Sequence, residues 1–201
     1  MLARKKAQKI KRAVTTPDCI LDVAERLMQT RGYNSFSYAD VAAEIGITKA
    51  GLYHHFGSKA KLGHAVTERY AGRVFAAAGA IDASGLDASL RLERYTQVYA
   101  GVLSQGRLCL VGMLAAEFNT LPEPMQETIR QYISGSERWL AALIGQGRAA
   151  GKLFPIGTDR EAALLLIGAL EGAMLIAGPM NDKAGFNSSV RQLLANLRRK
   201  P

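Results

Sequence analysis

The 201-residue sequence predicts an all-α protein. Apolar residues recur three and four positions apart through most of the chain, as they do along one face of a helix. Glycine and proline interrupt these segments where helices are expected to end, as at Gly32, Gly46 and Gly57. No stretch alternates apolar and polar residues for long enough to predict a strand, and the sequence contains no internal repeat.

The composition is that of a soluble protein with a substantial core, since 48% of the residues are hydrophobic. The longest apolar segment, from Glu161 to Gly178, is interrupted by Glu171, so we expect no membrane span. No apolar run follows the basic N-terminus, which predicts a cytoplasmic protein without a secretory signal. The two cysteines, Cys19 and Cys109, have no neighbours at metal-ligand spacing, and we expect neither a metal site nor a disulfide.

The net charge of +9 is concentrated at the N-terminus, where residues 1–12 carry six basic side chains and no acid. We expect residues 1–14 to form a flexible basic arm that adds phosphate contacts or enters a minor groove. The alternative is a disordered tail that serves only solubility.

The first helix is predicted to begin after Thr16, a good N-cap, with Pro17 at its first position and Gly32 as its end. Its inward stripe is Ile20, Val23, Ala24, Leu27 and Met28.

Two short helices separated by a glycine are predicted next. Ser37 begins a capping box whose acid is Asp40, Gly46 ends that helix, and Thr48 caps a further helix that Gly57 ends. The inward residues are Tyr38, Val41, Ala42 and Ile45 in the former helix, and Leu52 and Phe56 in the latter. A helix, a tight turn and a second helix make a helix-turn-helix, whose second helix would read DNA.

The outer face of this second helix carries hydroxyl, ammonium, imidazole and phenol groups beside small residues. Such groups donate to phosphates and small residues allow close approach, which suits a DNA major groove. Lys59 and Lys61, at the start of the following helix, lie where the DNA backbone should pass. The alternative is an ordinary helical hairpin with a solvated face. The predicted DNA contacts are Ser37, Tyr38, Thr48, Lys49, Ala50, Gly51, Tyr53, His54, His55 and Lys59.

The segment from Ile20 to about Tyr70 resembles the DNA-binding domain of the TetR family of transcriptional regulators. The matching pieces are Ile20-Leu21-Asp22-Val23-Ala24, Arg31-Gly32-Tyr33, Asp40-Val41-Ala42, Gly46-Ile47-Thr48, Leu52-Tyr53-His54-His55-Phe56-Gly57-Ser58-Lys59 and Leu62. The resemblance covers about a quarter of the chain. It implies an all-helical homodimer, with a DNA-binding domain and linking helix over residues 15–81 and a ligand-binding and dimerisation domain over residues 82–201.

Five helices are predicted after the linking helix, which itself is expected to run from Ser58 to about Ala80. Their expected ranges are 87–104, 108–119, 125–150, 159–177 and 188–199. Loop 82–86 is a plausible domain boundary. In the third of the five, the residues expected to face inward are Ile129, Ile133, Leu140, Leu143 and Ile144.

The helix over 159–177 has a broad apolar face in which Gly168 and Gly172 allow close approach of another helix. With the last helix, it would pair with its symmetry mate as a four-helix interface, as the resemblance implies. The alternative is an internal core helix. The predicted interface residues are Leu165, Gly168, Ala169, Gly172, Leu193 and Leu197.

Cys109 begins a segment that ends in Leu114-Ala115-Ala116-Glu117, which resembles a subset of the family in which some members sense electrophiles or oxidants through such a cysteine. Arg107 would favour the thiolate. Cys109 is therefore a sensor, a pocket wall or a core residue. The predicted ligand pocket, mainly apolar, is bordered by Cys109, Met113, Glu117, Phe118 and Trp139.

Nothing in the sequence has a catalytic pattern, because it lacks a phosphate loop and all three histidines lie between residues 54 and 64. We therefore expect no enzyme activity and no cofactor. The expected function is sequence-specific repression at a palindromic operator with half-sites roughly 34–36 Å apart, relieved by a small molecule or electrophile. The alternatives are an activator of the same architecture and a basic protein that coats DNA without sequence preference.

Overall fold

The structure, a computed structural model, describes residues 17–200 and confirms an all-α fold. The expected basic arm and the Thr16 cap lie outside the described residues. The helices are α2 (Pro17–Arg31), α3 (Tyr38–Ile45), α4 (Lys49–Phe56), α5 (Lys59–Asp82), α6 (Ala88–Ser104), α7 (Leu110–Ala116), α8 (Glu123–Ala149), α9 (Asp159–Met180) and α10 (Lys183–Arg198), with a short 3-10 helix at Phe118–Thr120.

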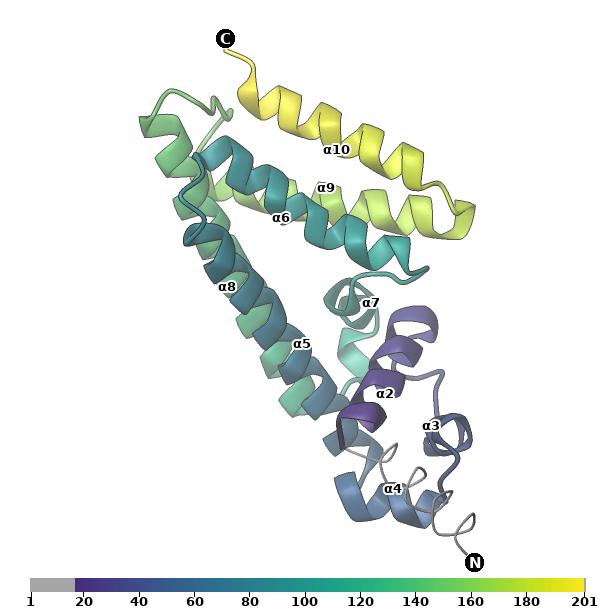
Figure 1. Cartoon of the computed structure of the whole chain (residues 1–201). Helices are drawn as coiled ribbons and strands as arrows, with labels where there is room; N and C mark the ends of the chain where they lie inside the picture. The colour runs from purple at the N-terminus through teal and green to yellow at the C-terminus, as the bar shows by residue number, and fades with distance from the viewer. Residues whose placement is uncertain (1–16, 201) are drawn as a thin grey trace, which may run out of the picture.

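The α2–α4 unit lies at one end of the molecule and the C-terminus at the other (Figure 1). Helices α5 and α8 run side by side, while α6, α9 and α10 pack together at the far end. The short helix α7 lies between α2 and the group formed by α6, α9 and α10, and it contacts α2, α5 and α8. One continuous hydrophobic core runs through both ends of the molecule, so a displacement in one part is felt in the next.

Local capping signals position the two short helices as expected. The Ser37 side chain accepts from the Asp40 backbone N–H and the Asp40 carboxylate accepts from the Ser37 backbone, which completes the capping box. These hydrogen bonds hold the pKa of Asp40 below its usual value. Gly46 adopts φ 75°, a left-handed conformation that costs glycine little, and Thr48 caps α4 by accepting from the Gly51 N–H at 3.1 Å.

A buried carboxylate fixes α2 against α5. Glu25 is buried among apolar residues, and its two oxygens accept from Arg69 at 3.2 Å and Arg73 at 2.5 Å. Arg69 also binds Asp22 at 2.7 Å. Removing either arginine would leave a buried charge short of a partner, so this network holds the α2–α4 unit rigidly on α5.

Three details of the C-terminal helices differ from the sequence expectation. Helix α10 begins at Lys183 rather than residue 188, because the Asp182 side chain caps it through the Gly185 N–H at 2.8 Å. Helix α9 continues through Pro179 and ends where Asn181 adopts a left-handed conformation with φ 49°. Ile133 is 38% exposed because the buried stripe of α8 passes through Tyr132 and Ser136 instead.

Helix α9 is also long and apolar enough to cross a membrane by length and composition alone, contrary to the expectation from its interruption by Glu171. In the fold, one side of this helix belongs to the core, through Ala163, Leu166 and Leu170. Its other side presents exposed apolar residues, which gives it an apolar surface on both sides.

Candidate functional site

Helix α4 presents a polar outer face at the end of the molecule that is farthest from the C-terminus (Figure 1). Leu52 is completely buried and anchors the helix on the core, while Tyr53, His54 and His55 are exposed. The first turn is also open, since Lys49 and Ala50 are exposed and Gly51 is half-buried. The predicted contact residues of α4 therefore lie together on one accessible surface.

Tyr38 is not part of that accessible surface, which corrects its assignment as a DNA contact. Its side chain is only 6% exposed, and its ring packs edge-on against Tyr53 with 4.7 Å between the ring centroids. Its hydroxyl is buried without a hydrogen-bond partner among the described residues, and burial raises the pKa of Tyr38 to about 12. Tyr38 therefore supports Tyr53 from beneath, whereas Ser37 remains exposed with its hydroxyl bonded to Asp40 at 2.7 Å.

Lys59 is directed inward and not toward the expected path of the DNA backbone. Its ammonium nitrogen lies 4.5 Å from the centroid of the Tyr33 ring and 4.7 Å from that of Phe36. Partial burial lowers the pKa of Lys59, against the attraction of Glu117 and Asp40. The side chain thus joins α5 to the connection between α2 and α3 through cation–π contacts. Lys61, two residues later, is the exposed ammonium at this position.

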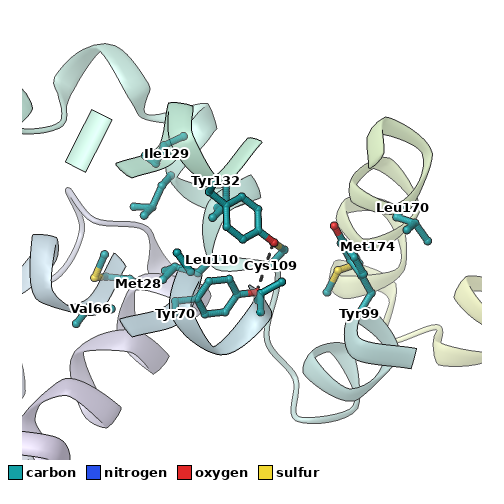
Figure 2. Close-up of a cluster of buried hydrophobic side chains, with 14 of the residues drawn as sticks. Met28, Val66, Tyr70, Tyr99, Cys109, Leu110, Ile129, Tyr132, Leu170 and Met174 are labelled. Carbon is teal, nitrogen blue, oxygen red and sulfur yellow. Dashed lines mark hydrogen bonds between the residues drawn. The ribbon is translucent and has the colours of Figure 1, made fainter. Parts of the chain in front are cut away.

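Cys109 is buried, which among the three alternatives favours a core residue or a pocket wall over a reactive sensor. Its side chain is 3% exposed, and the Tyr70 hydroxyl donates to its sulfur at 3.5 Å (Figure 2). Burial, and after it the nearby Glu171 carboxylate, raises the pKa of the Cys109 thiol well above its usual value. Because the thiolate is the reactive form, this thiol is protected both sterically and electrostatically.

The thiol belongs to a buried polar network that joins four helices. The Glu171 carboxylate on α9 accepts from the Cys109 thiol and the Tyr99 hydroxyl, and the Tyr99 hydroxyl lies 3.3 Å from that of Tyr95. Burial raises the pKa of Glu171, although these hydrogen bonds oppose the shift. A side chain at Gly112 would collide with the Glu171 carboxylate, so α7 approaches α9 closely at this point.

A cavity of about 10 Å³ borders this network, which is room for about one water molecule. Figure 2 shows Tyr70 and Tyr132 meeting Cys109 from one side, with Tyr99 and Met174 on the other. The cavity is lined by Tyr70, Val74, Val98, Tyr99, Val102, Cys109, Tyr132 and Met174.

The ligand-pocket residues predicted from the sequence are not brought together. Of the five, only Cys109 lines this cavity, and Met113 is half-buried. Trp139 donates from its indole nitrogen to Asp82 at 2.8 Å, and Phe118 lies beneath the Arg130 guanidinium at 5.0 Å.

Glu117, the fifth residue of that set, faces the turn between α2 and α3. Its carboxylate accepts from the backbone N–H groups of Tyr33 at 2.6 Å and Asn34 at 3.3 Å. Gly32 adopts φ 83°, and a side chain there would come within 2.7 Å of a Glu117 oxygen. The helical spacing from Cys109 failed at this residue because α7 ends at Ala116, so Glu117 leaves the shared face.

The outer face of α9 carries exposed apolar side chains, and α10 beside it adds half-buried ones. Leu165 is 69% exposed and Ile176 is 73% exposed, and a side chain at Gly168 or Gly172 would meet nothing within 4 Å. Ala169, Leu193 and Leu197 are half-buried. Exposed apolar residues that the sequence prediction missed are Leu164, Leu175 and Met180. Contiguous apolar patches of this kind mark interaction surfaces.

No group of three or more histidine, cysteine, aspartate or glutamate side chains that could hold a metal ion occurs within residues 17–200.

Comparisons with known proteins found a matching family model for each half of the chain. The family model described as bacterial regulatory proteins of the tetR family matches residues 20–66. The tetracyclin repressor-like C-terminal domain matches residues 88–193. The transcriptional regulator AcuR of Cereibacter sphaeroides is 31% identical over 130 residues, which is 61% of this chain. The matched stretch spans 58% of that relative's length.

Two solved structures resemble the chain over most of its length. A TetR-family regulator from Agrobacterium tumefaciens is 30% identical with a TM-score of 0.87, covering 94% of this chain and all (100%) of its own. A TetR regulator from Legionella pneumophila is 26% identical with a TM-score of 0.80, covering 89% of this chain and 95% of its own.

Proposed function

Because the chain belongs to the TetR family of bacterial transcriptional regulators, we propose that it is a homodimeric, cytoplasmic repressor that binds a palindromic operator and is released by a small ligand. Residues 15–81 are the DNA-binding domain with its linking helix. Residues 82–201 are the regulatory and dimerisation domain.

The exposed face of α4 is the observation that carries this proposal. Its open N-terminal turn presents backbone N–H groups and Lys49 to a phosphate, and Tyr53, His54 and His55 follow on the accessible side. Ser37, Thr48, Ala50 and Gly51 complete the contact set, in which Thr48 also caps the helix. Lys61 replaces Lys59 as the phosphate-facing ammonium, and Tyr38 supports the set without touching DNA.

The exposed apolar face of α9, with the half-buried leucines of α10 beside it, supports a dimer. Two copies that place these faces together would remove Leu165 and Ile176 from water, and Gly168 and Gly172 would allow the helix axes to approach closely. Such an arrangement puts two copies of α4 on one side of the assembly, as a two-fold symmetric operator requires.

The small cavity beside Cys109 supports a mechanism of release. Because it holds about one water, a ligand that binds there must enlarge it and displace the start of α7. The other end of α7 leads to Glu117, which holds the backbone at Tyr33 and Asn34. A ligand that prefers the enlarged cavity lowers operator affinity by its difference in affinity for the two arrangements.

The proposal is tested by selecting sequences that the full-length protein retains from a random duplex pool, followed by titration of the selected site. We expect a palindromic site whose binding survives a large excess of random duplex. Random duplex that competes equally well would instead support non-specific coating. Transcription from a promoter with the selected site should fall when the protein is added, whereas a rise would make it an activator.

Lys49→Ala tests the contact face itself. Losing one phosphate contact should reduce the slope of log K against log salt by about 0.9, while leaving the fold intact. The matched control is Arg94→Ala, which removes an exposed charge from α6 and should leave the slope unchanged. An unaltered slope for Lys49→Ala would remove this residue from the contact set.

A further inference from the structure

A second cavity, larger than the one beside Cys109, lies where α2 meets helices α6, α9 and α10. Its volume is about 270 Å³, just below the roughly 300–1,000 Å³ of pockets for drug-sized ligands. The end of α2, the connection between α6 and α7, and the end of α9 with the start of α10 form its walls. The lining residues that matter here are Gln29, Leu103, Arg107, Leu108, Pro179 and Lys183.

The charge in this cavity is positive and uncompensated. Arg107 and Lys183 both line it, and none of the residues that line it is acidic. Within residues 17–200, half-buried Arg107 makes no hydrogen bond or ion pair, and the Lys183 ammonium donates only to the Ser104 carbonyl at 3.0 Å. Lys183 is exposed, whereas Arg107 is partly removed from water without a counter-charge, which is costly, and a bound anion would supply the missing partner.

A buried amide also borders this cavity. Gln29 is 2% exposed, and its side-chain oxygen is buried without a hydrogen-bond donor among the described residues. Buried polar atoms are nearly always bonded, so this acceptor calls for a donor such as a water, and the charge of the anion is matched by the cations rather than by Gln29. Gln29 and Arg107 also line a neighbouring cavity of about 360 Å³, where the Asp22 and Glu25 carboxylates are already bound by Arg69 and Arg73.

The remaining wall is apolar. Leu103, Leu108 and Pro179 face the same cavity as the two cations. Inorganic phosphate would neutralise the two cations but would leave the apolar wall in contact with water or a void. An anion with a hydrocarbon portion neutralises the cations and also covers the apolar wall, because its apolar part removes that hydrophobic surface from water.

We propose that this cavity binds a small organic anion, with its charged group against Arg107 and Lys183 and its apolar part against Leu103, Leu108 and Pro179. This site is additional to the cavity beside Cys109 and does not depend on it.

The location of the site would allow a bound ligand to act on the arrangement of α2 relative to the other helices. The Leu108 backbone N–H donates to the Gln29 carbonyl at 3.4 Å, which joins α2 directly to the segment that leads into α7. A ligand in the cavity contacts both sides of this joint. It therefore acts on the angle between the DNA-facing unit and the regulatory helices, at the end of α7 opposite to Glu117.

The test is isothermal titration of the full-length protein, without DNA, with straight-chain monocarboxylates from acetate to hexanoate. Matched neutral amides and inorganic phosphate are titrated alongside. We expect saturable binding of at least one carboxylate at millimolar concentration, no binding of its amide, and weaker binding of phosphate. Absence of binding by every carboxylate overturns the site, and equal binding of phosphate overturns the organic class.

Variants identify the cavity as the place of binding. Arg107→Gln and Lys183→Gln should each weaken the carboxylate about tenfold or more, equivalent to about 1.4 kcal/mol. The control Arg94→Gln removes an exposed charge elsewhere and should bind like the parent. Full affinity in both cavity variants would overturn the assignment.

A melting assay covers the case in which one variant folds poorly. The carboxylate should raise the unfolding temperature of the parent and of Arg94→Gln but not that of Lys183→Gln. An equal rise in Lys183→Gln contradicts the site. Since no DNA is present, failure here leaves operator binding untouched, and failure of operator binding leaves this site untouched.

Discussion

Glu117 holds the turn after α2 from the regulatory half by accepting from two of its backbone N–H groups, beside a hydrogen bond from Asn34 to Thr120. Glu117→Ala removes the acceptor of the Tyr33 and Asn34 backbone N–H groups, and we expect a loss of about 1–2 kcal/mol in the free energy of unfolding. Urea unfolding at fixed protein concentration measures this loss. Glu117→Gln, which keeps a neutral acceptor, should lose less, and a Glu117→Ala protein as stable as the parent would show that the turn does not need this contact.

Glu171 makes a second residue-scale prediction, which concerns pH. Burial raises its pKa in the folded protein above the unfolded value. Such a group stabilises the fold fully below its unfolded pKa and loses that contribution as pH rises through the folded pKa. Glu171→Gln removes the titration while retaining an acceptor, so the parent should lose stability relative to the variant as the pH rises above the ordinary glutamate value of about 4.5.

Thermal unfolding of both proteins below and above that pH measures the difference. Glu161→Gln is a contrasting control, because hydrogen bonds from Thr158 lower the pKa of Glu161 and the dependence on pH should have the opposite sign. A constant gap between parent and Glu171→Gln would mean that Glu171 does not titrate differently on folding.

At the scale of the helix, α4 depends on Thr48 both as a cap and as a predicted neighbour of phosphate. Thr48→Asp separates the two roles, because aspartate caps as well as threonine but carries a negative charge. We expect the free energy of unfolding to stay within about 0.5 kcal/mol of the parent, while operator affinity falls by repulsion. Thr48→Ser should keep both properties. Unchanged operator affinity in Thr48→Asp would place the DNA backbone elsewhere.

The helices themselves were predictable because their signals are local. The Ser37 capping box, the Gly46 stop and the Thr48 cap all act within four residues, and each is found where the sequence indicated. The start of α10 was missed because its cap, Asp182, follows a proline that was expected to stop the chain from continuing as helix.

The site residues were less predictable where contacts span the sequence. Glu117 binds a turn 84 positions away, and the Cys109 environment depends on Tyr70, Tyr99 and Glu171 from three other helices. Periodicity within one segment does not contain that information. Similarly, the sequence indicates a basic side chain at Lys59 but not that two aromatic rings attract it inward.

At the scale of the whole molecule, the proposed dimer interface on α9 can be tested by a single substitution. A side chain at Gly172 meets nothing within 4 Å in one protomer, so Gly172→Trp should fold normally but block close approach of a partner. Sedimentation should then show monomer. The matched control is Gly101→Trp, an equally open glycine on α6, which should remain dimeric. A dimeric Gly172→Trp protein would place the interface on another surface.

Helix α5 also acts as a lever. At about 1.5 Å per residue its 24 residues span roughly 36 Å, with α4 attached at one end and the regulatory helices at the other. A tilt of only about 5° moves the α4 end by roughly 3 Å, close to the ~3.4 Å between successive base pairs. In the proposed operator complex, a change of angle too small to disturb the packing around α5 would therefore move α4 by about one base pair. On that proposal, the spacing of the two half-sites, and not the strength of any one contact, sets how rigid the regulatory core has to be.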